Sequence, residues 1–229
     1  MEPYLAAQRE NWQVLETVDS TNSVCRRLAL EGAPDGTVVL ADCQTAGRGR
    51  RGRSFQSAAG KGLFFSVLWR PHCPPEKLLP LTALSAVATC RAIRRVCGAE
   101  AQIKWPNDLV LGGKKLAGIL TEMALEGESG EVSHVVVGIG INVHQKKEDF
   151  QGEVGEIATS LDRELGGSVC RGQLAAALLE EIVTAQVTQI ADAYHAMHSL
   201  EECLETVLQK LIAEKKRVLH IYQSINRDV

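Results

Sequence analysis

The feature that most constrains the fold is a succession of short apolar runs that are typical of β-strands. They are rich in Val, Ile, Leu and Phe, and they lie at Gly36–Ala41, Gly62–Trp69, Gln102–Trp105, Leu109–Leu111, Ala117–Met123 and His134–Ile141. Gly112-Gly113 is a strong turn signal, so residues 109–123 are predicted to form a β-hairpin. Because the later runs follow one another without an intervening helix, they favour an antiparallel or mixed sheet over a Rossmann arrangement.

Three segments have the apolar spacing of helices. The first begins at Ser20 or Thr21, either of which can cap it, and ends near Glu31, just before a glycine and a proline. The others are Leu78–Cys97, which ends at a glycine, and the amphipathic segment Leu174–Met197. These helices are predicted to flank the sheet.

Strands and helices together predict an α+β domain over residues 1–198, with a mixed, largely antiparallel sheet flanked by helices. Residues 199–229 differ, because they contain no glycine or proline and no strand–turn alternation. Their apolar side chains recur at helical spacing and would share one face: Leu200, Cys203, Leu204, Val207, Leu208 and Leu211. We therefore expect a helical C-terminal tail.

Composition excludes several classes of protein. The 25 basic and 28 acidic residues give a formal charge of −3, which argues against a protein that coats DNA or RNA. The N-terminal residues lack the apolar core of a secretory signal, and no apolar stretch is long enough to span a membrane. The seven cysteines are scattered without a CxxC pair, so neither a disulfide framework nor a zinc site is indicated. These features are typical of a cytoplasmic protein.

The segment Gly47–Arg53 contains four arginines interleaved with three glycines, and it cannot be part of a core. Glycine lets the backbone fold closely around a ligand, and guanidinium groups bind carboxylate or phosphate oxygens in pairs. The alternative is a solvated basic turn or a nucleic-acid patch. Because the segment lies between a strand that ends near Gln44-Thr45 and the strand that begins at Gly62, an anion-binding loop is favoured.

A second polar motif, Lys104–Asp108, follows the end of a predicted strand. Asn107 could hydrogen-bond a polar ligand, and Asp108 could orient a donor or meet Mg²⁺ beside a triphosphate. A Pro-Asn-Asp turn is the alternative, since all three residue types favour turns. That alternative leaves the adjoining lysine and Trp105 without an explanation.

Three further segments are ambiguous when each is taken alone. Lys115 opens the strand that contains Gly118, where it could reach a developing negative charge or simply end a surface turn. The run Gly138–Val143 is a weak nucleotide signal, because no strand–GxGxxG–helix pattern accompanies it, but its glycines would let a ligand lie against the strand. Ser20–Asn22 could cap a helix or line a polar pocket.

The order of these motifs is more specific than any one of them. STN at 20–22, QTAGRGRRGR at 44–53, KWPND at 104–108, KLAGIL at 115–120, GIGINV at 138–143 and ATSL at 158–161 follow in that order. This succession resembles the catalytic domain of the biotin–protein ligases (biotin–[acetyl-CoA-carboxylase] ligases). The resemblance implies a class II aminoacyl-tRNA synthetase-like, biotin–lipoate ligase-like fold.

The resemblance also implies a two-step reaction. Biotin and ATP would form biotinyl-5′-AMP, and the biotinyl group would then pass to a lysine of the biotin carboxyl carrier protein of acetyl-CoA carboxylase. Because the first step brings an anionic carboxylate onto an anionic phosphate, fixed cations are needed. Mg²⁺ would bind together with ATP, and Asp108 is the protein residue that could lie near it.

Individual roles follow from the same resemblance. Biotin would be bound by Ser20, Thr21, Asn22, Gln44, Gly47, Arg48, Arg50, Lys115, Gly118, Gly138 and Gly140. The nucleotide would be bound by Arg50, Arg51, Arg53, Phe55, Trp105, Asn107, Asp108, Lys115 and Asn142. The catalytic residues implied are Arg48, Arg50 and Lys115, which would act by position and charge rather than as nucleophiles.

The sequence departs from the family pattern at three places. Phe55 stands where relatives often have a tryptophan that packs on adenine, no winged-helix segment precedes residue 1, and residues 199–229 do not resemble an SH3-like barrel. We therefore expect no binding to DNA. A lipoate-type ligase and a non-catalytic protein that binds biotin or its adenylate are the alternatives, and a homodimer is a further expectation.

Overall fold

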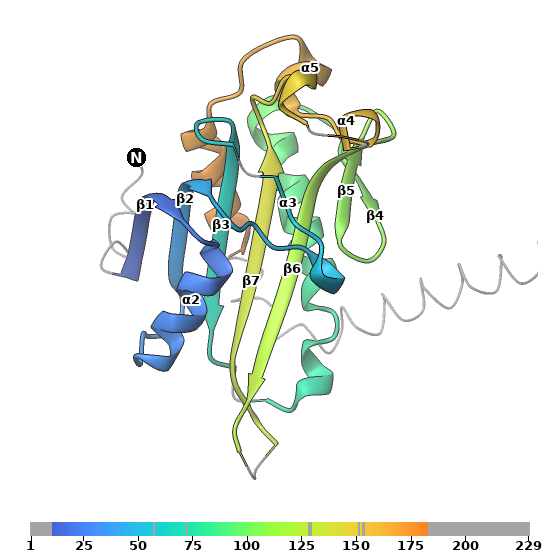
Figure 1. Ribbon diagram of the computed structural model, residues 1–229. Coiled ribbons are helices and arrows are strands. Elements are labelled where there is room, and N and C mark those ends of the chain that lie inside the picture. The colour runs from blue at the N-terminus through green and yellow to red at the C-terminus, as the bar shows by residue number, and fades with distance from the viewer. Residues whose placement is uncertain are drawn as a thin grey trace, which may run out of the picture. The chain divides into compact units, whose positions relative to one another are not determined.

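The computed structural model describes residues 11–182 except 57, 72, 128, 129, 151 and 153. Its centre is a seven-stranded sheet with the order β1-β2-β3-β7-β6-β5-β4 (Figure 1). The strands are β1 (Trp12–Val18), β2 (Thr37–Gln44), β3 (Gly62–Trp69), β4 (Gln102–Lys104), β5 (Asp108–Leu111), β6 (Lys114–Leu125) and β7 (Val132–Asn142). Only β1 and β2 pair in parallel, and every other neighbouring pair is antiparallel. The predicted mixed, largely antiparallel sheet is therefore confirmed.

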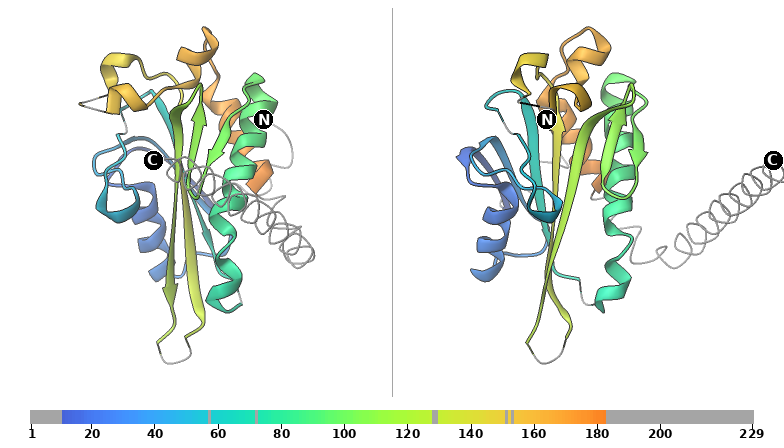
Figure 2. Two further views of the ribbon diagram at one scale, coloured as in Figure 1. Left: turned by 90° about the vertical axis from the view of Figure 1, so that its right-hand side faces the viewer. Right: turned by 45° about the vertical axis from the view of Figure 1, so that its right-hand side comes forward.

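Helices cover both faces of the sheet. Helix α2 (Thr21–Leu30) packs on one face, and α3 (Leu81–Cys97) packs on the other together with the helical residues 171–182 (Figure 2). Shorter helical segments are η2 (Arg50–Gly52), η3 (Pro75–Leu78), η4 (Lys147–Asp149), α4 (Val154–Ile157) and α5 (Leu161–Leu165). None of the helices in the described parts of the chain is both long and apolar enough to cross a membrane.

Strand parity divides the two faces of the central strands. The side chains that pack toward α3 come from odd positions: Leu63, Phe65, Val67 and Trp69 of β3, Val135, Val137, Ile139 and Ile141 of β7, and Ala117 and Ile119 of β6. Even positions face the opposite side, where Leu68 and Val136 pack against α2. Because β3 is buried along its whole length, its sequence is an apolar run that only Ser66 interrupts.

The predicted hairpin is confirmed, because β5 and β6 pair antiparallel around the Gly112-Gly113 turn. Both glycines have positive φ, 56° and 77°, as a two-residue turn with the twist of a hairpin requires. The hairpin β6–β7 extends the same meander, and its register sets Gly118 opposite Gly140 and Leu120 opposite Gly138. This pairing places two glycine-containing segments side by side.

Strand β1 is absent from the sequence prediction. Its apolar side chains at Trp12, Val14, Leu15 and Val18 follow neither a strand period nor a helical period, because Trp12 packs on one core while Leu15 and Val18 pack on the other. Val14 is 79% exposed at this edge of the sheet. Edge strands carry a weak pattern since only part of their surface is buried.

The described residues belong to one compact unit, which ends at Val183. The predicted domain end at residue 198, the second half of the predicted helix Leu174–Met197 and the predicted tail at 199–229 lie outside the described residues.

Candidate functional site

A pocket of about 450 Å³ opens on the face of the sheet that carries α2. Its walls come from the start of α2, the end of β2, the arginine–glycine loop and the start of β5, and its floor comes from β6 and β7. The lining residues are Ser20, Thr21, Asn22, Gln44, Arg48, Gly49, Arg50, Arg51, Arg53, Ser54, Phe55, Pro106, Asn107, Asp108, Lys115, Gly118, Ile119, Leu120, Gly138, Ile139 and Gly140. Most of the residues predicted for the site therefore line one cavity.

The floor depends on glycines at even positions of β6 and β7. A Cβ at Gly138 would lie 1.9 Å from Asn22 Oδ1, and a Cβ at Gly140 would lie 2.9 Å from Phe55 Cε1. At Gly118 the nearest atom would be Phe55 Cε2 at 3.4 Å. Side chains on two of these positions would fill the space that Asn22 and Phe55 use, so backbone alone forms this surface.

One end of the pocket is an array of hydroxyl and amide groups around Thr21. The backbone N–H of Thr21 donates to Gln44 Oε1 at 2.9 Å, and its hydroxyl donates to the same oxygen at 3.2 Å. Ser66 Oγ, fully buried in β3, lies 2.7 Å from both Thr21 Oγ1 and Asn22 Oδ1, so its single proton can go to either. We call Ser20, Thr21, Asn22, Gln44 and Ser66 the polar end.

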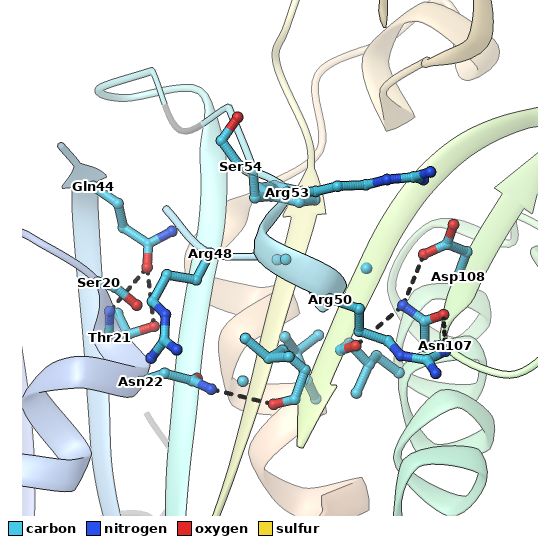
Figure 3. A pocket seen from close by; sticks show the side chains of 18 of the residues that line it. Ser20, Thr21, Asn22, Gln44, Arg48, Arg50, Arg53, Ser54, Asn107 and Asp108 are labelled. Atoms are coloured by element: carbon cyan, nitrogen blue, oxygen red, sulfur yellow. Dashed lines mark hydrogen bonds between the residues drawn. The ribbon is translucent and has the colours of Figure 1, made fainter. Parts of the chain in front are cut away.

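The opposite end is a chain of charged and amide groups around Asp108. Lys115 Nζ donates to Asp108 Oδ1 at 2.7 Å, and Asn107 Nδ2 donates to the same oxygen at 3.2 Å. Arg50 Nη1 donates to Asn107 Oδ1 at 2.9 Å. We call these four residues the cationic end, and Figure 3 shows Arg50, Asn107 and Asp108 across the cavity from Thr21 and Gln44.

The backbone of the cationic end is held by neighbouring strands. The N–H of Ile119 donates to the carbonyl of Asn107 at 2.8 Å, and Asn107 Nδ2 reaches the carbonyl of Ile119 at 3.3 Å. The N–H of Thr159 donates to the carbonyl of Lys115 at 2.8 Å, which ties the start of β6 to the segment 158–161. The peptide bond between Trp105 and Pro106 is cis. These contacts fix the backbone from which Lys115 and Asn107 project.

The arginine–glycine loop folds on itself and is attached to the sheet by side chains. Gly49 N–H donates to the carbonyl of Arg53 at 2.7 Å, and Phe55 N–H donates to the carbonyl of Gly47 at 2.9 Å. Arg51 occupies left-handed backbone with φ of 56°, which tightens the turn. Phe55 packs edge-to-face against Phe64 with ring centroids 6.3 Å apart, so the end of the loop rests on β3.

The three residues predicted to be catalytic do not lie together. Arg50 and Lys115 belong to the cationic end, whereas Arg48 extends toward Asn22 and Gln44 (Figure 3). There Arg48 forms a two-point ion pair with Glu122, with Nη1–Oε2 at 3.0 Å and Nη2–Oε1 at 2.8 Å. The positive charge of Arg48 is thus neutralised by Glu122, at the polar end of the pocket.

Three predicted residues do not line the pocket. Gly47 contributes its carbonyl to the fold of the loop, and the side chain of Trp105 is 63% exposed outside the cavity. Asn142 is 4% exposed and donates from Nδ2 to the carbonyl of Thr159 at 3.0 Å. The sequence prediction had no signal for that contact, since 17 residues separate the pair.

Sequence reasoning missed Ser66 and Glu122. Each is a polar residue on the pocket face of its strand. Ser66 interrupts the apolar run of β3, and that interruption was an available signal, whereas Glu122 lies in β6 next to Thr121 and gave no such signal. Among the residues that line the pocket, five are cationic and one, Asp108, is acidic. Within the described parts of the chain, no three His, Cys, Asp or Glu side chains are grouped so that they could hold a metal ion.

This geometry defines a class of protein: an α+β domain whose pocket has hydroxyl and amide groups at one end and Lys115 and Arg50 at the other. The model of the Biotin/lipoate A/B protein ligase family matches residues 14–142, and the chain belongs to this family. Over 156 residues it is 45% identical to the bifunctional ligase/repressor BirA of Bacillus subtilis, covering 68% of this chain and 47% of that protein.

Two further relatives support the family assignment. The biotin–[acetyl-CoA-carboxylase] ligase of Mycobacterium tuberculosis is 38% identical over 180 residues, which are 75% of this chain and 63% of the relative. The structure of biotin protein ligase from Aquifex aeolicus in complex with biotin and ATP superposes with a TM-score of 0.65 at 32% identity, over 79% of this chain and 72% of that one. The chain spans about half the length of the BirA relatives that it matches.

Proposed function

We propose that this chain is an ATP-dependent biotin–protein ligase. A carboxylate oxygen of biotin attacks the α-phosphorus of ATP, pyrophosphate leaves, and biotinyl-5′-AMP stays in the pocket. The amine of a lysine on a biotin carboxyl carrier protein then attacks the acyl carbon, loses a proton, and releases AMP as an amide forms. The observation that carries the proposal is the single cavity with a polar end and a cationic end.

The polar end suits the urea ring of biotin. A urea offers one carbonyl acceptor and two N–H donors, and the polar end offers oxygens and N–H groups of both kinds. The dithiolane ring of lipoate has no N–H or C=O group, so it could not form the hydrogen bonds that Thr21, Asn22 and Gln44 can offer to a urea ring. A site built for polar recognition rejects a ligand that lacks the matching groups, and this favours biotin over lipoate.

The cationic end suits the adenylation step. The attacking carboxylate and the α-phosphate are both anionic, so their approach requires cations that are already in place. Asp108 and Asn107 hold Lys115 and Arg50 by the hydrogen bonds described above, which limits their reorganisation during the reaction. In this proposal Lys115 contacts both the carboxylate and the α-phosphate, and Arg50 stabilises the phosphate charge.

The glycine floor suits the acyl chain that joins the two ends of the ligand. Because Gly118, Gly138 and Gly140 carry no side chains, Asn22 and Phe55 pack close to the backbone of β6 and β7, which leaves room in the pocket for an acyl chain between its two ends. Phe55 stands over the same strands and offers an aromatic face to the nucleotide. Arg51 and Arg53, at the rim, are assigned to phosphate contacts.

Mg²⁺ fits this site as a companion of ATP. The cation is usually held by phosphate oxygens and water with one or two protein carboxylates, and Asp108 supplies one carboxylate in the pocket. When bound, it would neutralise phosphate charge and orient the leaving pyrophosphate. Lys115 and Arg50 would position the α-phosphate by direct contact.

Two measurements test the proposal. Pyrophosphate release would be followed with ATP and Mg²⁺ in the presence of biotin, lipoate or neither acid, and biotinyl-5′-AMP would be identified by its mass. A purified biotin carboxyl carrier domain would then be added and its lysine biotinylation measured. Biotin-dependent release followed by transfer is the expected result.

Other outcomes identify the alternatives. A faster reaction with lipoate would make the chain a lipoate-type ligase, and biotin binding without pyrophosphate release would make it a binding protein. Adenylate formation without transfer to the carrier would confine the proposed function to the first step. A variant with Lys115→Met provides the control for contaminating ligase activity.

A further inference from the structure

Glu122 lies on β6 at the polar end of the pocket, and its side chain is 20% exposed. Besides the two contacts from Arg48, its carboxylate accepts a hydrogen bond from Asn22 Nδ2 at 3.0 Å. Arg26 of α2 lies near the same carboxylate, with Nη1 3.7 Å from Oε1. One acidic side chain therefore joins the arginine–glycine loop, the start of α2 and the sheet.

The contact with Glu122 determines how the Asn22 amide is turned. Both amide hydrogens of Asn22 point toward acceptors, the carbonyl of Leu120 at 3.2 Å and the carboxylate of Glu122 at 3.0 Å. A rotated amide would place its oxygen against two groups that only accept. Asn22 Oδ1 is therefore directed toward Ser66 and over Gly138, where it serves as an acceptor in the pocket.

The contact with Arg48 determines where the loop lies. A paired guanidinium–carboxylate contact fixes direction as well as distance. Together with the hydrogen bond from Arg50 to Asn107, it ties the loop to the sheet at both ends of the pocket. Without Glu122 the Arg48 side chain would lose its partner on the sheet, and the polar end would be covered less tightly.

We infer that Glu122 is a positioning residue for recognition of a cyclic urea: it presents Asn22 Oδ1 to a ligand N–H and fastens the Arg48 segment over the same end. The urea part of this inference rests on the proposed function. Glu122 acts through Asn22 and Arg48 and leaves the cationic end unchanged, because its side chain contacts neither Lys115 nor Asp108 in the contacts described for it.

The first test compares Glu122→Gln with Glu122→Asp and with Glu126→Gln, a matched charge change just beyond the end of β6. Glu122→Gln should raise the Kd and KM for biotin by about tenfold or more, the effect of disturbing a charged, half-buried hydrogen-bond set. The KM for ATP and kcat at saturating biotin should stay within about threefold. Glu122→Asp keeps the charge and should recover part of the affinity.

A double-mutant cycle tests the route through Asn22. In an Asn22→Ala background, Glu122→Gln should raise the biotin Kd by a clearly smaller factor than in the unmutated protein, because only its effect through Arg48 remains. Fully additive losses, a kcat defect equal to the KM defect, or a biotin Kd of Glu122→Gln within about twofold of the unmutated protein would overturn the inference.

A second test needs no ligand. Limited digestion with trypsin, with cleavage after Arg48, Arg50, Arg51 and Arg53 quantified by mass spectrometry, reports how firmly the loop is held. Glu122→Gln should be cut there several times faster at an unchanged Tm, and Glu126→Gln should match the unmutated protein. Equal cleavage rates would overturn the tethering role, and a lowered Tm shared by Glu122→Asp would make Glu122 merely structural.

The two tests separate this inference from the proposed function. If the unmutated protein does not bind biotin while Glu122→Gln still accelerates cleavage, the proposed function and the urea assignment are wrong and the tethering role stands. If biotin is bound and adenylated equally well by both proteins, the proposed function stands and the inference is wrong.

Discussion

Asn142 and Thr159 are joined by a hydrogen bond from Nδ2 to the carbonyl oxygen at 3.0 Å, at the end of β7. Thr159 in turn donates its N–H to the carbonyl of Lys115 at 2.8 Å. Asn142 is thereby two contacts away from the lysine assigned to the reaction, although it does not line the pocket. Its position suggests a role in holding Lys115 rather than a contact with the nucleotide.

Replacing Asn142 with alanine tests this role. The change leaves a buried carbonyl without its donor, so the free energy of unfolding should fall by about 1–3 kcal/mol. The rate of pyrophosphate release should fall because the backbone of Lys115 loses support, with little change in the KM for ATP. Chemical denaturation and steady-state kinetics measure both. A raised KM for ATP at unchanged stability would instead support the nucleotide contact that the sequence predicts.

The separation of Arg48 from Arg50 predicts different defects for their alanine variants. Arg50→Ala removes a cation beside Asn107 and should slow pyrophosphate release far more than it weakens biotin binding. Arg48→Ala removes the two-point contact with Glu122 and should mainly raise the Kd for biotin. Calorimetry with biotin and a pyrophosphate assay measure the two effects, and identical profiles for the two variants would contradict the assignment of ends.

Replacing Lys115 with methionine removes the cation between the two reacting anions. Adenylation should slow by about 100- to 1000-fold, the usual effect of deleting one group that stabilises transition-state charge. The Kd for biotin without ATP should rise much less, because the polar end is untouched. Single-turnover formation of biotinyl-5′-AMP measures the loss, and Lys115→Arg, which keeps the charge, is the matched comparison. A slowing of less than tenfold would remove Lys115 from the reaction.

A single methyl group at Gly138 should disrupt the polar end. The new Cβ would lie 1.9 Å from Asn22 Oδ1, so Asn22 must leave its position between Ser66 and Leu120. Biotin affinity should fall by at least about tenfold, consistent with lost hydrogen bonds and steric conflict. Gly172→Ala is the control, since its Cβ would meet only Cys170 Sγ at 3.9 Å and lies in a helix. Titration of both variants with biotin decides the matter.

Burial raises the pKa of the Cys25 thiol to about 12, because α2 packs it against the sheet. At pH 8.5 Cys25 should therefore resist iodoacetamide in the folded protein, whereas the exposed Cys170 should react. The same pKa shift also makes the free energy of unfolding depend on pH. Since the folded pKa lies above the ordinary value of 9.0, the contribution of Cys25 is intact below pH 9 and is lost as the pH rises toward 12. Peptide mapping after alkylation, and unfolding at rising pH, measure the two effects.

Much of the sheet could be predicted because its strands carry strong local signals. The strand Gly62–Trp69 is an apolar run broken only by Ser66, and the β5–β6 turn is marked by two adjacent glycines with positive φ. The start of α2 was predicted at Ser20 or Thr21, and Ser20 is its N-cap residue, although its side chain makes no capping hydrogen bond. In each case the signal lies in neighbouring residues. Strand β1 was missed because its apolar side chains pack on two different cores, and a short stretch of sequence does not reveal that arrangement.

The site was predictable in its members but not in its arrangement. Short motifs named Thr21, Arg48 and Lys115, whereas the ion pair of Arg48 with Glu122 joins residues 74 positions apart. Asn142 was assigned to the nucleotide because it ends a glycine-containing strand that otherwise faces the pocket. Its contact with Thr159 depends on how the chain returns to the end of β7, and the residues around Asn142 do not indicate that path.

The contact between Asn22 and the carbonyl of Leu120 spans 98 residues, so the polar end closes one of the longest loops in the domain. Contacts of such long sequence separation are slow to form, because the entropy of loop closure is lost before the contact stabilises the chain. The floor from β6 and β7 can assemble locally, but the pocket exists only after α2 has docked. A ligand bound there thus stabilises the folded state of the whole sheet by mass action. Ligand binding measured during refolding should therefore report the docking of α2.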